Sequence, residues 1–315
     1  MRTFKQKLEK QWEKGKFVCV GLDPDVRKFP THLKSLHTEE QQVFDFLKEV
    51  IDSTAKIVAA FKPNCAFFEK FGFLGARIYV MICQYIKAFH PDVVLICDAK
   101  RGDIENTNNG SAEFFFDRCG GDALTIHGYL GPEANQPFLK RADKGVFMLC
   151  RTSNSGAGEF QDRMVEITPE EARMFNLPAG KQSAPFDYEI SVPEAEMMAR
   201  ELYARKRQMP LYQFVAARVS HFWNEKGNCG LVTGATYPEE IKMVRQVAPH
   251  LPLLIPGIGK QGGDLEKSVR AARMRFLISS SRDILYASHG EDFAQVARAK
   301  AIELDKQIRA LVAER

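Results

Sequence analysis

Short apolar runs recur along this chain, and polar or glycine-rich residues follow each of them. Eight such runs have the length of a buried strand in a parallel sheet, and they begin near residues 17, 58, 93, 123, 145, 229, 251 and 275. Segments with helical spacing lie between most of them, for example 39–56, 69–88 and 238–247. Strands that alternate with helices predict a parallel sheet covered by helices.

The eightfold repeat predicts a (β/α)8 TIM barrel. A doubly wound open sheet is the alternative, but the first apolar run lacks the G-x-G-x-x-G turn with which that fold would bind a dinucleotide. An amphipathic segment at 3–14 carries Phe4, Leu8 and Trp12 on one face and could close the bottom of the barrel. We therefore expect residues 1–315 to form a single barrel domain.

One region interrupts this rhythm. About seventy residues, 155–228, separate the fifth apolar run from the sixth, which is far longer than a usual connection. We expect an insertion on the active-site side of the barrel, part lid and part added surface. The helix that follows the fifth strand should lie somewhere inside it.

The third apolar run leads directly into three charged residues, Asp98, Lys100 and Asp103. Side chains alternate along a strand, so Asp98 and Lys100 should leave the strand end on the same face. Burying such charges costs several kcal/mol each unless they are paired. Taken alone, this motif is most simply interpreted as a salt bridge that stabilises the strand end. The polar residues at the other strand ends favour a functional site instead.

Reactive groups of a barrel gather where its strands end, at the carboxyl-terminal rim. The other strand ends contribute further polar residues, namely Asp23, Lys62, Ser153, Gln261 and Arg282. Ammonium groups interleaved with carboxylates would repel a metal ion, so this set favours metal-free chemistry. The glycine-rich loop 256–263 can present backbone N–H groups to a phosphate, and Arg282 can add a guanidinium.

Composition narrows the class of protein. The net charge of +4, from 44 basic and 40 acidic residues, comes without the basic runs of a nucleic-acid binder. Seven cysteines occur singly, with no C-x-x-C, which is typical of a reducing compartment and argues against a zinc site. No apolar stretch has membrane-spanning length. We expect a cytoplasmic protein that binds neither nucleic acid nor membrane.

Taken together, the motifs resemble those of the orotidine 5′-phosphate decarboxylase family. The run D-A-K-R-G-D-I at 98–104 is similar to the signature of its bacterial-type subgroup. Further segments resemble the other sequence blocks of the family, in the same order: 21–25, 61–64, 151–154, 234–236, 256–264 and 280–282. Two departures are visible: Ser155 stands where the subgroup often has proline, and 104–107 lacks the common glycine-containing continuation.

The resemblance implies a (β/α)8 barrel that works as a homodimer with shared active sites. It implies conversion of orotidine 5′-phosphate to UMP and CO2 in de novo pyrimidine biosynthesis, without a metal or cofactor. The aromatic group Phe67, Phe68, Phe71 and Phe73 would then serve packing or the dimer surface.

The resemblance also implies a role for each site residue. Lys100 would protonate carbon 6 of the pyrimidine, Asp98 would face the substrate carboxylate, and Lys62 would hold the charges in register. Asp103, with Thr107, would reach into the site of the partner subunit. Substrate binding would fall to Asp23 at the ribose, Ser153 at the pyrimidine edge, Gln261 between base and phosphate, and Gly262, Gly263 and Arg282 at the phosphate.

Two other functions stay open. Sugar-phosphate decarboxylases and hexulose-phosphate synthases of the same superfamily also use D-x-K-x-x-D, typically with Mg²⁺. Lys62 in the second strand and the pair of Ser153 and Gln261 argue against them. A barrel that binds a nucleotide without turning it over is the other alternative, and the complete charged set argues against it, because an inert binder has no need of such strain.

Overall fold

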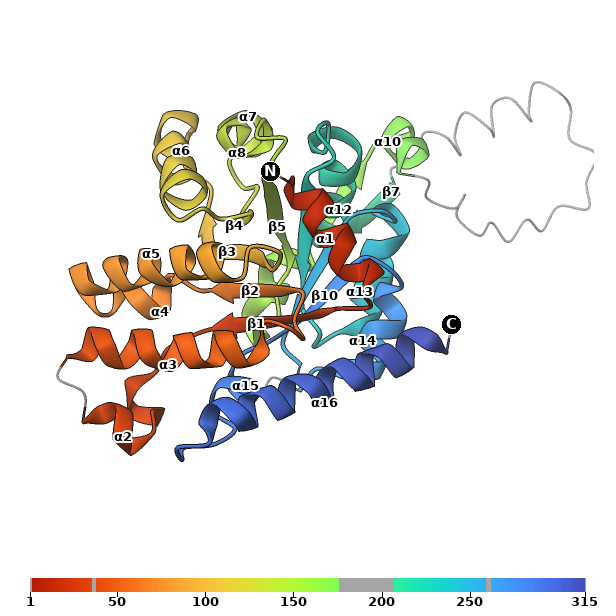
Figure 1. The fold of residues 1–315 in the computed structure, drawn as a ribbon. Coiled ribbons are helices and arrows are strands. Elements are labelled where there is room, and N and C mark those ends of the chain that lie inside the picture. Colours follow the sequence, from red (N-terminus) through yellow and green to blue (C-terminus); the bar gives the residue numbers. More distant parts are fainter. Residues whose placement is uncertain (1, 36–37, 176–206, 259–261, 315) are drawn as a thin grey trace, which may run out of the picture.

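Eight parallel strands close into a barrel with helices packed around it (Figure 1). The computed structural model describes residues 2–35, 38–175, 207–258 and 262–314, and only the backbone of Arg207. Neighbouring strands follow the order β1-β10-β9-β8-β5-β4-β3-β2, and all of their pairings are parallel. The predicted (β/α)8 barrel is therefore confirmed.

Each of the eight predicted runs contains one barrel strand. The strands are β1 (Val18–Leu22), β2 (Ala60–Pro63), β3 (Val94–Arg101), β4 (Ala123–Ile126), β5 (Gly145–Arg151), β8 (Cys229–Thr233), β9 (Leu253–Pro256) and β10 (Phe276–Ser280). Most of their residues are buried, because inward side chains fill the barrel and outward side chains pack beneath helices.

Among the described residues, eight helices have eight or more residues, and most of them form the layer around the barrel. They are α1 (Phe4–Glu13), α3 (Glu39–Thr54), α5 (Gly72–Phe89), α6 (Glu105–Ala112), α12 (Leu211–Arg218), α13 (Pro238–Val247), α14 (Leu265–Ala272) and α16 (Phe293–Ala313). Shorter helices are α2 (Thr31–Lys34), α4 (Ala66–Glu69), α7 (Gly131–Ala134), α8 (Gln136–Leu139), α9 (Gly158–Gln161), α10 (Pro169–Met174) and α15 (Arg282–Leu285). Within the described part of the chain, no helix has the length and apolar character that crossing a membrane requires.

Helix α1 closes one end of the barrel, as its amphipathic pattern predicts. Phe4 and Leu8 are buried in the cluster that fills the barrel interior. The ring of Phe4 meets that of Phe147 edge to face at 5.7 Å between centroids. Lys7, also buried, donates to Asp122 at 3.0 Å. This plug lies at the amino-terminal ends of the strands and leaves the opposite rim for the site.

The expected insertion contains a hairpin and a barrel helix. Strand β6 (Met164–Ile167) pairs antiparallel with β7 (Arg207–Pro210). Helix α12 follows directly and packs against β5 and α13, so it is the helix that the fifth barrel strand requires. The division of 155–228 into lid and added surface stays a prediction.

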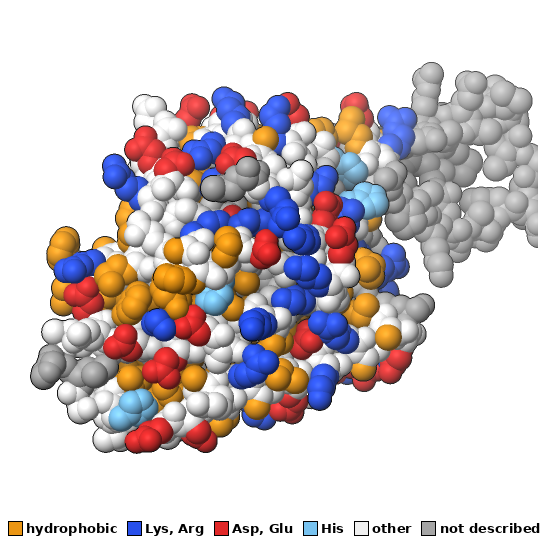
Figure 2. Space-filling model, viewed as in Figure 1, with side chains coloured by type: hydrophobic (Ala, Val, Ile, Leu, Met, Phe, Trp, Pro, Cys, Tyr) orange, Lys and Arg blue, Asp and Glu red, His pale blue; other side chains and the backbone are white. Residues whose placement is uncertain are grey.

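Exposed apolar side chains gather over α4 and the start of α5 (Figure 2). Phe67, Phe73 and Leu74 are 38%, 82% and 42% exposed there, whereas Phe68 is buried in the core. Of the aromatic group expected to serve packing or a dimer surface, Phe68 thus serves packing and Phe73 faces outward.

Candidate active site

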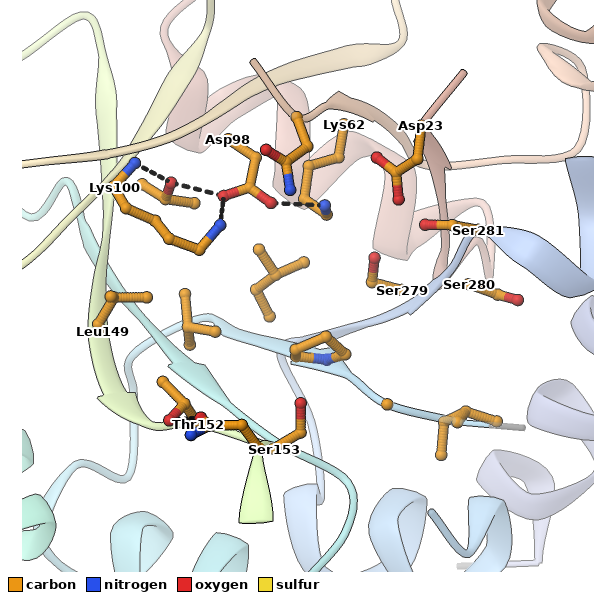
Figure 3. Close-up of a pocket in the computed structure, with 18 of the residues that line it drawn as sticks. Asp23, Lys62, Asp98, Lys100, Leu149, Thr152, Ser153, Ser279, Ser280 and Ser281 are labelled. Carbon is orange, nitrogen blue, oxygen red and sulfur yellow. Dashed lines mark hydrogen bonds and ion pairs between the residues drawn. The ribbon is translucent and has the colours of Figure 1, made fainter. Parts of the chain in front are cut away.

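A cavity of about 860 Å³ opens at the carboxyl-terminal ends of the strands. Every barrel strand contributes to its wall, either with its last residues or with those just after it (Figure 3). Six of the predicted site residues line it, namely Asp23, Lys62, Asp98, Lys100, Ser153 and Arg282. The closure of the barrel brings these residues together from positions up to 259 apart in the sequence.

Asp98 lies between two lysines at the centre of this wall. Its Oδ2 is 2.8 Å from Nζ of Lys62 and its Oδ1 is 2.7 Å from Nζ of Lys100. Burial opposes the charge of Asp98, but the two ammonium groups outweigh it and hold the pKa of Asp98 well below its usual range. Burial likewise opposes the charge of Lys62, yet Asp98 and Asp23 raise its pKa above the usual value. Both groups are therefore charged at neutral pH.

A backbone irregularity directs Lys100 into the cavity. The register between β3 and β4 shifts between Cys97 and Arg101, and Lys100 has a left-handed φ of +49°. A residue other than glycine adopts this conformation rarely and at a cost of about 1 kcal/mol, so the surroundings must hold it. Asp98 and Lys100 do meet as predicted, but a bulge brings them together where the prediction used simple alternation.

Thr125 of β4 holds this bulge and was missed by the sequence analysis. Its hydroxyl accepts the backbone N–H groups of Ala99 and Lys100, each at 3.0 Å, and donates to Oδ1 of Asp98 at 2.9 Å. A hydroxyl at an inward position near a strand end is the signal that could have revealed it. Asn64 and Gln161 also line the cavity and were not predicted.

Asp23, just after β1, is a half-buried residue whose carboxyl group has an incomplete set of partners. Within the described residues its Oδ1 has no hydrogen-bond partner. Burial raises its pKa, and Lys62 offsets this only in part. A hydroxyl group of a ligand would supply the missing donor.

The ends of β9 and β10 form another side of the cavity. Gly257, Ile258, Ser280, Ser281 and Arg282 line it there, at the position where barrels often bind phosphate. Gly262 and Gly263 lie in the adjoining loop, and Gly263 donates its N–H to the carbonyl of Gly257 at 3.1 Å. Gln261, which was expected to span base and phosphate, falls outside the described residues.

Ser153 lies on the loop that follows β5. Its backbone rests against Gly234, where a Cβ atom would come within 2.9 Å of the Ser153 backbone. The hydroxyl of Thr236 donates to the Ser153 carbonyl at 3.3 Å. The G-A-T segment after β8 therefore fixes the position of Ser153 at the cavity wall.

Asp103 and Thr107 do not line this cavity. Both are exposed at the start of α6, where Oδ1 of Asp103 accepts the N–H of Ile104 at 2.7 Å. Buried Asn108 holds this turn, because it accepts from the N–H of Asp103 at 3.0 Å and donates to its carbonyl at 2.6 Å. Of the predicted site residues that the structure describes, four do not line the cavity: Asp103, Thr107, Gly262 and Gly263.

Comparison with known proteins shows the family of the chain. A model of the orotidine 5′-phosphate decarboxylase / HUMPS family matches residues 16–295. The chain is 39% identical to orotidine 5′-phosphate decarboxylase of Janthinobacterium sp. (strain Marseille), over 99% of this chain and 100% of that protein. The solved structure of Leishmania donovani OMP decarboxylase is 30% identical, with a TM-score of 0.74 over 99% of both chains. The chain belongs to the orotidine 5′-phosphate decarboxylase / HUMPS family.

Proposed function

We propose that this cavity decarboxylates orotidine 5′-phosphate to UMP and CO2 in pyrimidine biosynthesis, and that Lys100 supplies the proton. The activity is supported by curated relatives that carry the name orotidine 5′-phosphate decarboxylase and match nearly the whole chain. The observation that carries the residue assignment is the charge pair at the end of β3, in which an ionised Asp98 lies 2.7 Å from the ammonium of Lys100.

The chemistry follows from these two charges. Asp98 is ionised, so the carboxylate of the substrate placed beside it meets a like charge, and this repulsion ends when CO2 leaves. The electron pair of the broken bond remains on carbon 6. The ammonium of Lys100 stabilises the developing carbanion and then protonates it. Lys62, which is 8% exposed and bonded to Asp98, keeps the carboxylate in place.

The remainder of the substrate would be bound by the other strand ends. Asp23 would accept a hydrogen bond from a ribose hydroxyl, and Ser153 would contact the pyrimidine edge. Arg282 and the loop with Gly262 and Gly263 would bind the phosphate. Because the phosphate is remote from the reacting bond, its binding energy can serve to assemble the site. The ammonium of Lys62 occupies the space between Asp98 and Asp23 where a cation would otherwise lie, so we propose that the reaction needs neither metal nor cofactor.

A homodimer with shared active sites is part of the proposal. Asp103 and Thr107 are exposed and lie outside the cavity of their own chain. Exposed apolar residues also occur in the connections after three neighbouring strands: Phe73 on α5 is 82% exposed, Ile104 after β3 is 59% exposed, and Tyr129 after β4 is 93% exposed. Exposed apolar side chains of this kind suit an interface with a second copy of the chain.

A cytoplasmic location also stays a proposal. It is supported by the seven cysteines, all of which are buried free thiols, as expected of a protein from a reducing compartment.

Turnover of orotidine 5′-phosphate in excess EDTA tests the proposed function. The wild type should convert the substrate to UMP, measured as the change in ultraviolet absorbance of the base. Lys100→Ala should lose at least about a thousandfold in kcat, since it removes both the proton donor and the stabilising charge.

Lys140→Ala, which changes a lysine elsewhere on the barrel, serves as the matched control and should keep wild-type turnover. Activity restored only by Mg²⁺, or seen only with sugar phosphates, would assign the chain to the sugar-phosphate relatives. Tight UMP binding without turnover would support the alternative of a barrel that binds a nucleotide without catalysis.

A further inference from the structure

Arg151, the last residue of β5, is a buried cation that does not line the cavity. Its side chain makes a bidentate pair with Glu240 of α13, at 2.6 Å from Nε and 3.1 Å from Nη2. It also lies 3.2 Å from a carboxylate oxygen of Asp162 and 3.3 Å from Oε1 of Gln161. One guanidinium thus joins the end of a barrel strand to a helix and to a rim loop.

The rim loop, residues 152–162, closes on itself at this guanidinium. Oε1 of Gln161 accepts the backbone N–H of Thr152 at 2.9 Å, and Nε2 of Gln161 donates to the Thr152 hydroxyl at 3.0 Å. Because Arg151 binds Gln161 and Asp162, it holds the far end of the loop beside the near end. Most residues between these ends line the cavity, among them Ser153 and Phe160.

The two limbs of the rim loop are held by different contacts. The near limb is fixed by backbone, since Gly234 donates its N–H to the Arg151 carbonyl at 2.7 Å and packs on Ser153. The far limb, with Phe160 at 70% exposure, contacts α12 through α9, and it is held to the end of β5 by Arg151 and by the bonds between Gln161 and Thr152. Loss of the guanidinium should therefore loosen the far limb where it meets β5, while the near limb stays in place.

We infer that Arg151 is a positioning residue that sets recognition of the substrate's base by holding the rim loop closed over that part of the cavity. The inference rests on the proposed function, in which Ser153 contacts the pyrimidine. The phosphate falls to the ends of β9 and β10, and within the described residues Arg151 makes no hydrogen bond or ion pair there. Loss of Arg151 should therefore weaken the contacts to the base and spare those to the phosphoribosyl part.

A comparison of UMP with ribose 5-phosphate separates these two parts, because the two ligands differ in the base. In Arg151→Lys the charge remains but the fork that binds two acceptors is lost. We expect the Kd for UMP to rise about tenfold, the effect of losing one charge-assisted hydrogen bond, and the Kd for ribose 5-phosphate to stay within about twofold. Calorimetry measures UMP directly, and ribose 5-phosphate is measured by competition with UMP.

Two further variants keep the test decisive. Glu240→Gln removes the partner charge and leaves Arg151 intact, so it should shift the ratio of the two Kd values in the same direction by less. Arg141→Lys is the matched control, since Arg141 also forms a bidentate pair, with Asp117 at 2.7 and 3.3 Å, but lies before β5 and away from the cavity. Its ratio should equal that of the wild type.

Each result supports or overturns the inference. Thermal unfolding of each variant fixes a temperature at which all are folded. An Arg151→Lys protein that loses affinity for both ligands equally, or for neither, would show that Arg151 does not act on the base, and the proposed function would stand. A wild type that binds ribose 5-phosphate as tightly as UMP would overturn the proposed function and the inference with it.

Discussion

The carboxyl group of Asp23 is held where its charged form is unfavourable. The folded protein binds a proton on Asp23 more tightly than the unfolded chain does, because burial raises the pKa. The contribution of Asp23 to stability therefore decreases as the pH rises from the ordinary value of 3.8 through the raised pKa of the folded state. The opposite holds for Asp98, whose pKa the two lysines lower: its contribution to stability is present above 3.8 and is lost as the pH falls through its folded pKa.

Asp23→Asn should consequently stabilise the folded state at neutral pH while substrate binding weakens. Urea unfolding at pH values from 4 to 8 should show that the free energy of unfolding of the variant increases relative to that of the wild type as the pH rises, since asparagine cannot ionise. Asp98→Asn is the contrasting variant and should be less stable than the wild type at pH 7, because it leaves Lys62 without its closest carboxylate. A difference between Asp23→Asn and the wild type that does not vary with pH would contradict this account.

At the scale of elements, one arginine joins α13 to the loop between α14 and β10. Arg245 is 4% exposed, and its acceptors are backbone carbonyl oxygens, those of Ala248, Pro249, Leu251, Ala272 and Met274 at 2.8 to 3.1 Å and that of Arg275 at 3.5 Å. Burial lowers its pKa to about 10, so it stays charged at pH 7. The carbonyls belong to helix ends and turns at the amino-terminal ends of β9 and β10, opposite the cavity.

Arg245→Met should therefore destabilise the protein and leave its chemistry intact. The change leaves several carbonyl groups without a donor, and we expect a loss of about 3 kcal/mol in the free energy of unfolding. Urea unfolding measures this loss, and kcat at a temperature where the variant is folded should equal that of the wild type. Arg270→Met, which removes two exposed ion pairs, with Glu266 and Glu314, should change stability little. A fall in kcat for the folded Arg245→Met protein would disagree with this assignment.

At the scale of the whole molecule, the proposed shared site has a consequence that one chain alone cannot produce. Lys100→Ala and Asp103→Ala should each be inactive as homodimers. After the two proteins are unfolded, mixed and refolded together, half of the dimers would be mixed. Each mixed dimer contains one site with both changes and one with neither, so about a quarter of wild-type activity should return.

Lys100→Ala mixed with Lys62→Ala is the matched control, because both changes fall in the same chain's half of the site. A mixed dimer of these two proteins contains no intact site, so no activity should return. Recovery in the control, or none with Asp103→Ala, would rule out a site shared through Asp103.

Much of this protein could be predicted from its sequence. Alternation of apolar runs with helical segments is a local property, so the barrel, all of its strands and the plug formed by 3–14 were predicted correctly. Strand ends of a parallel barrel meet at one rim, which is why Asp23, Lys62, Asp98, Lys100, Ser153 and Arg282 could be grouped before any contact was known.

Only the tertiary structure decided how these groups act on one another. Thr125 supports Lys100 through a bulge. The pattern of apolar residues does not predict this bulge, because the bulge depends on how β3 pairs with β4. Arg151 gains its role from Glu240, 89 residues away, and the raised pKa of Asp23 comes from burial by the closed barrel. The sequence by itself determined which chemical groups reach the rim, because the position of each strand along the chain and the residue at which it ends follow from local patterns. Their charges, partners and strain were set by packing, which is a property of the whole fold.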